Sequence, residues 1–407
     1  MAATTTGAGV GERLALEGGR PVRGRMLPYG RQWVGAEEVA DVLEVLRSDW
    51  LTTGPMVAAF EERFAAAVGA RCAVAVSSGT AALHAAAFAA GIGPGDEVIT
   101  TPLTFAATAN CVLYQGGRPV FADVDPETLN MDPNEVERLI TPRTRAIIPV
   151  HFAGHPCDMD ALRAIADRHG LAVIEDCCHA LGAEWRGRRV GALGPLNAFS
   201  FHPVKHITTG EGGMITTDSP ELAARLRSFR NHGLEGDAAD RLRRGEWVYD
   251  MVALGYNYRL TDLQCALGLR QLERLNAFLS RRQRLAARYL EGLRDLTCQV
   301  LPEIRLPVVR PGARHAWHLF VVQLSGDRDA AFAALRAENI GVTVHYRPVH
   351  LLTYYRERLG TREGLCPRAE AAAQRVLTLP LFPRMTDRDI ADVIAAVRKV
   401  LAWRRRC

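Results

Sequence analysis

The sequence predicts an α/β protein with a large domain, built on a mostly parallel sheet with helices on both faces, and a smaller α+β domain after it. Short β-branched runs alternate with helix-like segments over the first part of the chain. Such alternation requires crossover connections, which produce parallel strands. Beyond residue 262 the pattern changes to a long amphipathic helical segment. A chain of 407 residues that is 48% hydrophobic is long enough to bury the cores of two domains.

Hydrophobic periodicity assigns the elements of the large domain. Apolar side chains recur at helical spacing in four segments, which we expect to be helices: 36–48, 56–69, 79–91 and 158–170. Short runs rich in β-branched and other apolar residues predict strands at 72–78, 96–101, 118–124, 145–152, 171–178 and 197–203.

The small domain begins with a long helix in which Leu272, Leu275 and Leu279 share one face. Strands are then predicted at 317–324 and 341–346, with a helix near 330–339 between them. The closing helix follows a cap at Thr386 and has apolar residues at helical spacing, namely Ile390, Val393, Ile394, Val397 and Leu401. We expect a flexible leader at 1–25, the large domain at 26–270 and the small domain at 271–407.

Composition narrows the class of protein. Fifty Lys and Arg against 45 Asp and Glu leave a net charge of +5, too dilute to indicate a nucleic-acid partner. We expect the basic C-terminal WRRRC to be solvated. The nine cysteines form no paired framework, which is typical of a reducing compartment. Apolar stretches long enough for a signal peptide or a membrane span are absent from the sequence, so we expect a cytoplasmic protein without a membrane partner.

A candidate anion site lies in the sequence AVSSGTAAL. Ser77, Ser78, Gly79 and Thr80 fall between a predicted strand and a predicted helix. Free backbone N–H groups and the helix dipole favour an anion there, and glycine permits a close approach. An ordinary capped turn is an alternative explanation of the same residues.

Two further residues complete a chemical pattern. Asp176 ends a predicted strand, where open α/β sheets bind ligands, although a capping acid is an alternative. Lys205 lies between an aromatic-rich strand and a glycine-rich turn in SFHPVKHITTGEGG, and a partly buried lysine can form an imine with a carbonyl. Anion site, acid and lysine together match pyridoxal 5′-phosphate, whose phosphate, pyridine nitrogen and aldehyde need these three groups.

From about Met26 to the last helix, the chain resembles the fold-type-I, DegT/StrS-like nucleotide-sugar aminotransferases. The resemblance is carried by motifs in a fixed order: LTTGP (51–55), SSGTAAL (77–83), TPLTFAATAN (101–110), EDCCHALGA (175–183), SFHPVKHITTGEGG (200–213), GYNYRLTD (255–262) and VHYRPVH (344–350). It implies an aspartate aminotransferase-like fold, pyridoxal 5′-phosphate as cofactor and a homodimer with shared active sites. The Cys177–Cys178 pair departs from commoner versions of the family.

Within the family, the chain is most similar to the transaminases of pseudaminic acid synthesis that aminate UDP-2-acetamido-2,6-dideoxy-β-L-arabino-hex-4-ulose. The sequences LPYGRQ, SFHPVKHITTGEGG and VHYRPVH carry this closer similarity. It implies transfer of an amino group from an amino acid, L-glutamate, to C4 of a UDP-linked 4-keto-6-deoxy-N-acetylhexosamine. The product would be UDP-4-amino-4,6-dideoxy-N-acetyl-β-L-altrosamine.

The resemblance also implies roles for individual residues. Lys205 would hold the cofactor as a Schiff base and move protons, while Asp176 would keep the pyridine nitrogen protonated. The other cofactor-binding positions would be Ser78, Gly79, Thr80 and Ser200 at the phosphate, Phe105 on the ring, His179 near the phenolic oxygen and Asn257 from the neighbouring subunit. The substrate-contacting positions would be Tyr29, Leu51, Thr52, Thr53, Gly54, His318, Leu319, Phe320 and Val321.

Alternatives remain for several of these residues and for the function. Phe105 could be a core residue, and Glu211 could be structural or assist the substrate. His151, His155 and Cys157 have a spacing that could bind zinc, but a second ligand pair is lacking, so we expect no metal. Another 3- or 4-keto UDP or dTDP sugar could be the substrate. A sugar dehydratase or a non-catalytic regulator is disfavoured because Lys205 and Asp176 are present.

Overall fold

The computed structural model describes residues 13–236, 245, 247–297 and 303–405. Its main sheet has seven strands in the order β1-β9-β8-β5-β4-β2-β3. They are β1 (Cys72–Val76), β2 (Glu97–Thr100), β3 (Arg118–Phe121), β4 (Thr144–Ile148), β5 (Ala172–Asp176), β8 (Leu196–Ser200) and β9 (Gly213–Thr217). The six strands predicted for the large domain all lie in this sheet. The seventh, β9, was not predicted, and it pairs antiparallel with both β1 and β8.

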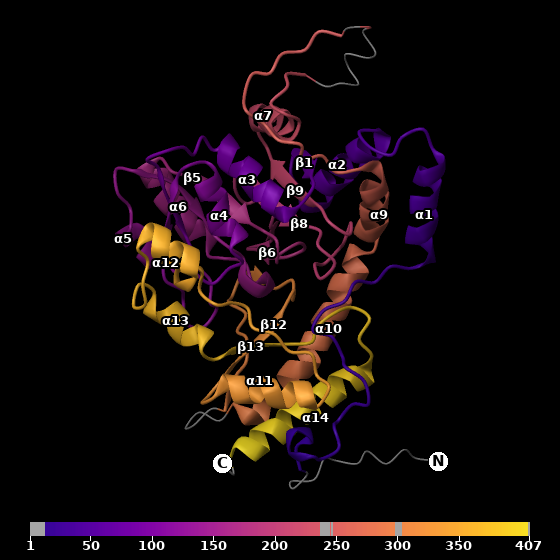
Figure 1. Ribbon diagram of the computed structural model, residues 1–407, viewed down its shortest axis with the longest axis vertical. Coiled ribbons are helices and arrows are strands. Elements are labelled where there is room, and N and C mark those ends of the chain that lie inside the picture. Colours follow the sequence, from indigo (N-terminus) through magenta and orange to yellow (C-terminus); the bar gives the residue numbers. More distant parts are fainter. Residues whose placement is uncertain (1–12, 237–244, 246, 298–302, 406–407) are drawn as a thin grey trace.

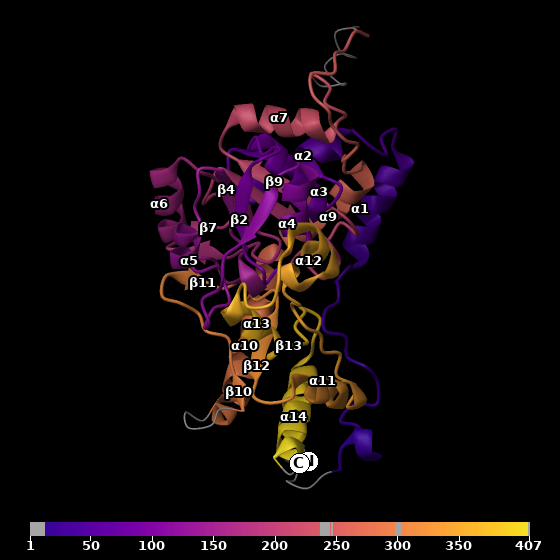
Figure 2. The same cartoon turned by 60° about the vertical axis from the view of Figure 1, so that its left-hand side comes forward.

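Helices cover both faces of this sheet (Figures 1 and 2). On one face pack α3 (Gly79–Ala89), α4 (Ala107–Tyr114) and α7 (Pro220–Arg230). On the other pack α2 (Pro55–Val68), α5 (Pro133–Arg138), α6 (Met159–His169) and α9 (Asp262–Glu273). α1 (Ala36–Arg47) lies along α9. Because both faces are covered, Val74 and Val76 face one core while Ala73 and Ala75 face the other.

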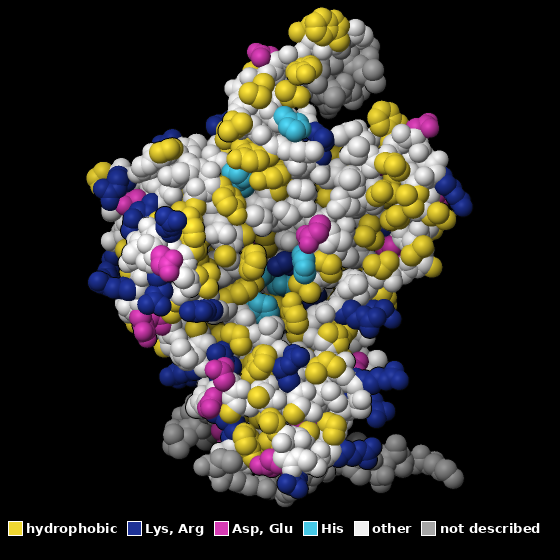
Figure 3. Space-filling view, viewed as in Figure 1, with side chains coloured by type: hydrophobic (Ala, Val, Ile, Leu, Met, Phe, Trp, Pro, Cys, Tyr) yellow, Lys and Arg dark blue, Asp and Glu magenta, His cyan; other side chains and the backbone are white. Residues whose placement is uncertain are grey.

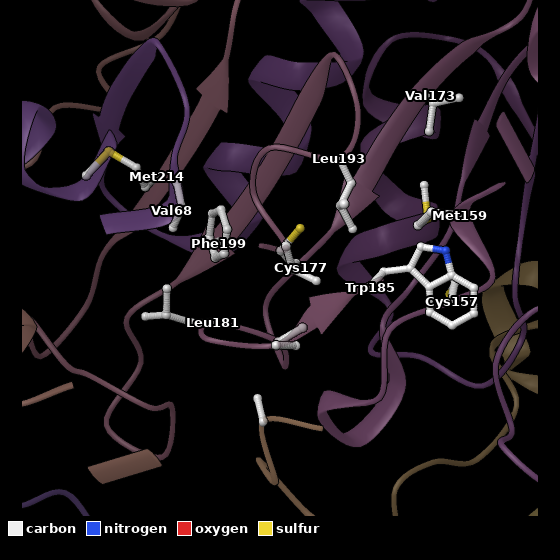
Figure 4. Packing of buried hydrophobic residues seen from close by; sticks show 14 of the residues in the cluster. Val68, Cys157, Met159, Val173, Cys177, Leu181, Trp185, Leu193, Phe199 and Met214 are labelled. Carbon is white, nitrogen blue, oxygen red and sulfur yellow. The ribbon is translucent and has the colours of Figure 1, made fainter. Parts of the chain in front are cut away.

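Aromatic and sulfur-containing side chains pack among aliphatic ones in the second of these cores (Figure 4). Phe199 of β8 contacts Phe64 of α2 edge-to-face, with ring centroids 5.0 Å apart. Trp185 lies close to Cys157 and Met159 (Figure 4). This packing fixes two strands of the candidate site. β5 ends in Asp176, and β8 precedes the loop that carries Lys205.

The second part of the chain has its own core around a small antiparallel sheet, β10-β12-β13. Its elements are α10 (Leu275–Gly292), β10 (Ile304–Arg305), β12 (Phe320–Leu324), α11 (Arg328–Ala337), β13 (Val376–Leu379) and α14 (Asp387–Arg404). The cap predicted for the closing helix is confirmed, because Thr386 Oγ1 accepts a hydrogen bond from the Asp389 N–H at 3.1 Å. A third small sheet joins β6 (Glu184–Trp185), β7 (Arg188–Arg189) and β11 (Ala313–Arg314).

The predicted strand at 341–346 is wrong. This segment makes a single bridge, between Thr343 and Thr378, and then leaves the sheet. The reason is a tertiary contact: the Tyr346 hydroxyl hydrogen-bonds His179 at 3.0 Å. The β-branched residues of this segment favour a strand, but the contact between Tyr346 and the large domain directs the chain away from the small sheet.

A further apolar core joins the two parts of the chain. Leu103 and Phe121 of the large domain pack with Val349, Tyr355 and Cys366. The short elements of this region are η4 (Val349–Leu351), α12 (Thr353–Leu359) and α13 (Pro367–Ala373). These segments lie beside the large domain in both ribbon views (Figures 1 and 2). The two parts are therefore held together next to the candidate site.

Residues 13–25, which we assigned to a flexible leader, pack against the second part of the chain. Leu14 is buried there, and the Glu338 carboxylate accepts hydrogen bonds from the Ala15 and Val22 N–H groups at 2.9 and 2.8 Å. Three short 3₁₀ helices are also present: η1 (Ala15–Glu17), η2 (Phe152–Gly154) and η3 (Arg294–Leu296). Residues 1–12 and the final two residues of WRRRC lie outside the described residues. The domain boundaries at 25 and 270 stay a proposal.

In the described ranges we find no helix with the length and apolar character needed to cross a bilayer. The seven described cysteines are all free thiols.

Candidate active site

The acid of the site is Asp176, the last residue of β5. It is buried, and its two oxygens accept hydrogen bonds from the Thr108 hydroxyl at 2.7 Å and the Cys178 N–H at 3.1 Å. Thr108 lies on α4 and is hydrogen-bonded in turn to Thr104. The chain continues from Asp176 into turns instead of a helix, so a helix-capping role does not account for this residue. Its position at the carboxyl end of a central strand is where α/β sheets bind ligands.

The predicted anion site lies at the start of α3. The Ser78 hydroxyl caps the helix by accepting a hydrogen bond from the Ala81 N–H at 3.0 Å. Gly79 packs against the ends of two strands: a Cβ there would lie 2.7 Å from Ser200 Cβ and 3.3 Å from Cys178 Sγ. The structure thus brings Ser78, Gly79 and Ser200 together. Backbone N–H groups in the first turn of a helix lack intrahelical acceptors and remain available to a phosphate.

Lys205 lies in the loop between β8 and β9, where its N–H closes a tight turn by donating to the His202 carbonyl at 2.8 Å. Its side chain is half-buried. Burial lowers the pKa of the Lys205 amine, and the nearby Cys178 thiol and Asp176 carboxylate partly offset this shift. The lysine therefore lies within electrostatic reach of the acid, and a larger share of its amine is neutral than for an exposed lysine.

Histidines surround the lysine. The His179 and His318 rings have centroids 4.5 Å apart, and those of His206 and His318 are 5.5 Å apart. Burial, with the charge of Lys205 as a further cause, lowers the pKa of His345 to about 3 and holds the pKa of the other three well below the ordinary value. Figure 3 shows histidines beside a Lys or Arg side chain in a hollow near the centre of this face. The cluster is polar but uncharged at neutral pH.

Two atoms in this cluster are open to a ligand. Among the described residues, His179 Nδ1 and His318 Nδ1 are buried and lack a hydrogen-bond partner. Buried polar atoms are nearly always paired, so unpartnered ones beside a lysine and an acid fit a site that receives a polar molecule. Together with the helix N-terminus, these groups fit the phosphate, the ring and the aldehyde of pyridoxal phosphate.

Other predicted residues have different surroundings. Phe105 is 63% exposed, so the alternative that it is a core residue is wrong. Tyr29 contacts His345, with ring centroids 5.7 Å apart, and therefore lies at the edge of the cluster. Residues 51–53 are exposed and lead to Gly54, the N-cap of α2, whose N–H donates to Asp262 at 2.7 Å. That contact ties the segment to α9 instead of the histidine cluster.

The side chains of residues 318–321 have different surroundings. His318 faces the lysine, whereas the side chains of Leu319, Phe320 and Val321 are buried in apolar cores. A role for those three in substrate contact stays a prediction and is limited to their backbone. Asn257 is exposed and lies between Tyr256 and Tyr258 in sequence.

Three residues of the cluster were missed by the sequence-based list: His206, His345 and Tyr346. His206 follows the lysine directly, and its Nε2 hydrogen-bonds the Ala316 carbonyl at 3.0 Å. His345 and Tyr346 belong to the motif VHYRPVH, which was noted only as part of the resemblance. A polar pair inside an otherwise β-branched run was the available signal.

The zinc alternative receives little support from the geometry. His155 Nε2 accepts a hydrogen bond from the Arg310 N–H at 3.0 Å, and His151 Nδ1 accepts one from the Cys157 N–H at 3.0 Å. A different trio, His151, Glu175 and Cys177, places its ligand atoms within 4.8 Å of one another. Both ring nitrogens of His151 already have partners, since Nε2 is hydrogen-bonded to Glu175 at 2.8 Å and Nδ1 to the Cys157 N–H.

A strand-end carboxylate, a helix N-terminus and a half-buried lysine on a mostly parallel sheet define a pyridoxal-phosphate-dependent transferase. The model of the DegT/DnrJ/EryC1/StrS aminotransferase family matches residues 32–398. The chain belongs to this family of sugar aminotransferases, and its fold is the fold-type-I transferase fold.

Individual relatives agree with this assignment. The chain is 47% identical to the spore coat polysaccharide biosynthesis protein SpsC of Bacillus subtilis, over 93% of this chain and 98% of that protein. It is similar to the PLP-form of the putative sugar aminotransferase Spr1654 from Streptococcus pneumoniae, at 29% identity and a TM-score of 0.86, covering 92% and 98% of the two chains. Pyridoxal 5′-phosphate is therefore the cofactor.

A third relative is described by the pathway in which it acts. PseC of Helicobacter pylori, an aminotransferase involved in the biosynthesis of pseudoaminic acid, has a TM-score of 0.85 and 28% identity, covering 93% of this chain and 99% of its own.

Proposed function

We propose that this enzyme transfers an amino group from an amino acid, L-glutamate, to C4 of a UDP-linked 4-keto-6-deoxy-N-acetylhexosamine, giving UDP-4-amino-4,6-dideoxy-N-acetyl-β-L-altrosamine. The observation that carries the reaction class is Lys205, half-buried with a lowered pKa, within electrostatic reach of Asp176. The motif similarity to pseudaminic acid transaminases and the fold shared with PseC support the choice of sugar.

Each group of the site has a task in this reaction. Bound pyridoxal phosphate supplies an aldehyde that exchanges amines and a ring that accepts electrons. The Lys205 amine acts as nucleophile and as the base that carries a proton between reacting carbons. Asp176, fixed by Thr108 and Cys178, places a negative charge where a pyridine nitrogen can stay protonated.

The histidines provide a polar, uncharged wall around the lysine. Because their pKa values are held low, they do not add positive charge next to the Lys205 amine at neutral pH. The Tyr346 hydroxyl fixes the orientation of His179 through its hydrogen bond to Nε2, so that Nδ1 faces an otherwise unpartnered position.

A panel of UDP- and dTDP-linked keto sugars tests the proposed substrate. Purified enzyme loaded with cofactor is incubated with L-glutamate and each sugar, and products are analysed by mass spectrometry and NMR. We expect the UDP-4-keto-6-deoxy-N-acetylhexosamine to be aminated at C4 with the highest kcat/KM, and the two half-reactions to give ping-pong kinetics. Amination of the other sugars alone contradicts the proposed substrate while leaving the class of enzyme intact.

A different keto sugar is the second candidate. It is favoured by the higher identity to SpsC, a protein of spore coat polysaccharide biosynthesis, at 47% against 28% for PseC. The same panel separates the two candidates, because a C3 product or a dTDP-linked product is distinguished by NMR.

We also propose that the enzyme is a cytoplasmic homodimer with shared sites. The location is supported by the free thiols of the described cysteines. The dimer is supported by residues 247–258, which we name the strap and which carry exposed apolar side chains such as Trp247 and Leu254. Its described residues extend beyond α7 (Figure 1). Exposed apolar clusters of this kind are typical of protein interfaces.

Asn257 is well placed on the strap for such a contact. Tyr256 and Tyr258 stack with centroids 5.0 Å apart and pack on Phe229 and His84, that is, toward their own chain. In extended backbone, neighbouring side chains point to opposite sides. Asn257 is therefore directed away from its own chain, where it can complete the phosphate site of a partner.

Mixed dimers test this arrangement. Asn257→Asp is expected to be nearly inactive, because it sets a carboxylate against the cofactor phosphate, and Lys205→Ala is expected to be inactive. When the two variants are co-refolded in equal amounts, about half of the dimers are mixed and each has one intact site, which restores roughly a quarter of wild-type activity. If Asn257 serves its own chain, verified mixed dimers recover no activity, and the shared site is refuted.

A further inference from the structure

We propose that Arg282 is a positioning residue for the active site: its buried guanidinium clamps the backbone of residues 317–318 so that the His318 imidazole packs on His179 beside Lys205. The inference rests on the proposed amino-transfer role of the Lys205 site. Arg282 itself lies behind that site, on α10, and is assigned no contact with the reacting atoms.

In the clamp, three backbone carbonyl oxygens share the two N–H groups of one guanidinium nitrogen. Arg282 Nη1 donates to the carbonyls of Trp317 and His318, both at 3.1 Å, and to that of Leu381 at 3.0 Å. The residue is 1% exposed, and the partners found for its guanidinium within the described ranges are backbone carbonyls and no carboxylate. A buried charge without a counter-ion is costly, so the carbonyl contacts must compensate a large desolvation penalty.

A simple structural tie does not require such a residue. On the same helix, the Tyr289 hydroxyl donates to the Pro380 carbonyl at 2.8 Å and so holds the segment 380–381 with a neutral group. What Arg282 adds is the link to residues 317–318. Its charged guanidinium donates hydrogen bonds to two carbonyls of the segment that carries His318.

That segment has a conformation that needs support. Trp317 has a φ of 52°, a left-handed backbone that a bulky residue rarely adopts. The neighbouring residues are held from the large domain, since the Ala316 and Leu319 N–H groups donate to Gly154 and Ala153 at 2.9 and 3.1 Å. Together with the Arg282 hydrogen bonds, these contacts hold the backbone before and after His318, and the imidazole has a defined place on His179.

The charge of Arg282 acts on the histidines as well. After burial, which is the largest cause, it contributes to the low pKa of His206 and of His318. Lys205 acts in the same direction on both residues, and His179 on His318. The guanidinium therefore supports both the position and the neutral state of His318.

A double-mutant cycle tests the proposal on cofactor-loaded enzyme. The readouts are the visible circular dichroism of the bound cofactor, the rate of amino transfer from L-glutamate and the melting temperature. Arg282→Met is expected to slow amino transfer about 100-fold, the effect typical of a misplaced active-site group, and to change the visible dichroism. In a His318→Ala background the same substitution should add little, because Arg282 acts through His318. Full additivity of the two effects would overturn the proposal.

Tyr289→Phe is the matched control. It removes a buried hydrogen bond from the same helix to the Pro380 carbonyl, so it should lower the melting temperature while keeping the wild-type dichroism and rate. If it reproduces the loss seen in Arg282→Met, or if Arg282→Met retains wild-type dichroism and rate, the role of Arg282 is only structural and the proposal fails.

Two further measurements test the proposal even if Arg282→Met does not fold. Arg282→Lys retains the charge on a shorter side chain without the guanidinium plane, so it should fold and show an intermediate dichroism and rate. Added guanidinium should partly restore Arg282→Ala, whose short side chain leaves room for it. If Arg282→Met does not fold, the dichroism and rate of Arg282→Lys are compared with those of Tyr289→Phe. The proposal requires a loss in Arg282→Lys and wild-type values in Tyr289→Phe. If wild-type enzyme shows no transfer from L-glutamate, that donor fails, and the visible dichroism still tests the position of His318.

Discussion

Replacement of Lys205 by alanine is expected to abolish amino transfer, lowering the rate by roughly 10⁴-fold or more, as loss of a nucleophile does in other enzymes. The amine is the nucleophile of the site and its proton carrier, and the surrounding histidines offer only weakly basic imidazoles in its place. The measurement is product formation by mass spectrometry, with the melting temperature as a check on folding.

The chain offers an unusual control for this experiment, since Lys205 and Lys399 are its only lysines. Lys399 lies on α14, where its ammonium is buried and paired with Glu338 at 2.9 Å. Lys399→Met should lower stability and leave the rate constant of the folded enzyme near that of wild type. Substantial activity in folded Lys205→Ala would contradict the role assigned to the lysine.

Asp176→Asn is expected to have the second-largest effect. The substitution keeps the size of the side chain but removes the negative charge that favours a protonated pyridine nitrogen, so both half-reactions should slow by about 10²- to 10³-fold. The rates are measured from the visible absorbance of the cofactor after mixing with amino donor and, separately, with keto sugar.

Thr108→Val supplies a milder comparison. It leaves the Asp176 charge in place and removes one hydrogen bond at 2.7 Å, so the rate should fall far less than in Asp176→Asn. Near-normal turnover in Asp176→Asn would show that the acid has a structural role only.

The sequence could predict most of the large-domain sheet because its strands are short apolar runs separated by helices of clear period. β9 was missed because GMITT follows β8 without a helix between them, and an antiparallel return across a loop leaves no alternation to detect. Residues 341–346 had strand-like composition, yet the contact between Tyr346 and His179 overrides it. In both cases tertiary context decided the outcome.

For the candidate site, too, the residues in local motifs could be predicted, whereas those that depend on the tertiary fold could not. Lys205, Asp176 and Ser78 to Thr80 lie within local motifs, at positions that strand ends and helix starts dictate. For Leu319, Phe320 and Val321 a motif alone does not show that the side chains are buried in two apolar cores, and their substrate contact stays a prediction. Arg282 escaped notice since only the fold brings α10 against residues 317–318.

The most direct test of the account is to locate the cofactor on the chain. Purified enzyme with bound cofactor is reduced with borohydride, digested and mapped by mass spectrometry. With only two lysines in 407 residues, the possible side-chain positions are few. We predict one stable adduct per chain, on the peptide that contains Lys205. An adduct on Lys399, or a fully loaded enzyme without an adduct at Lys205, would contradict the assignment of this lysine as the centre of the active site.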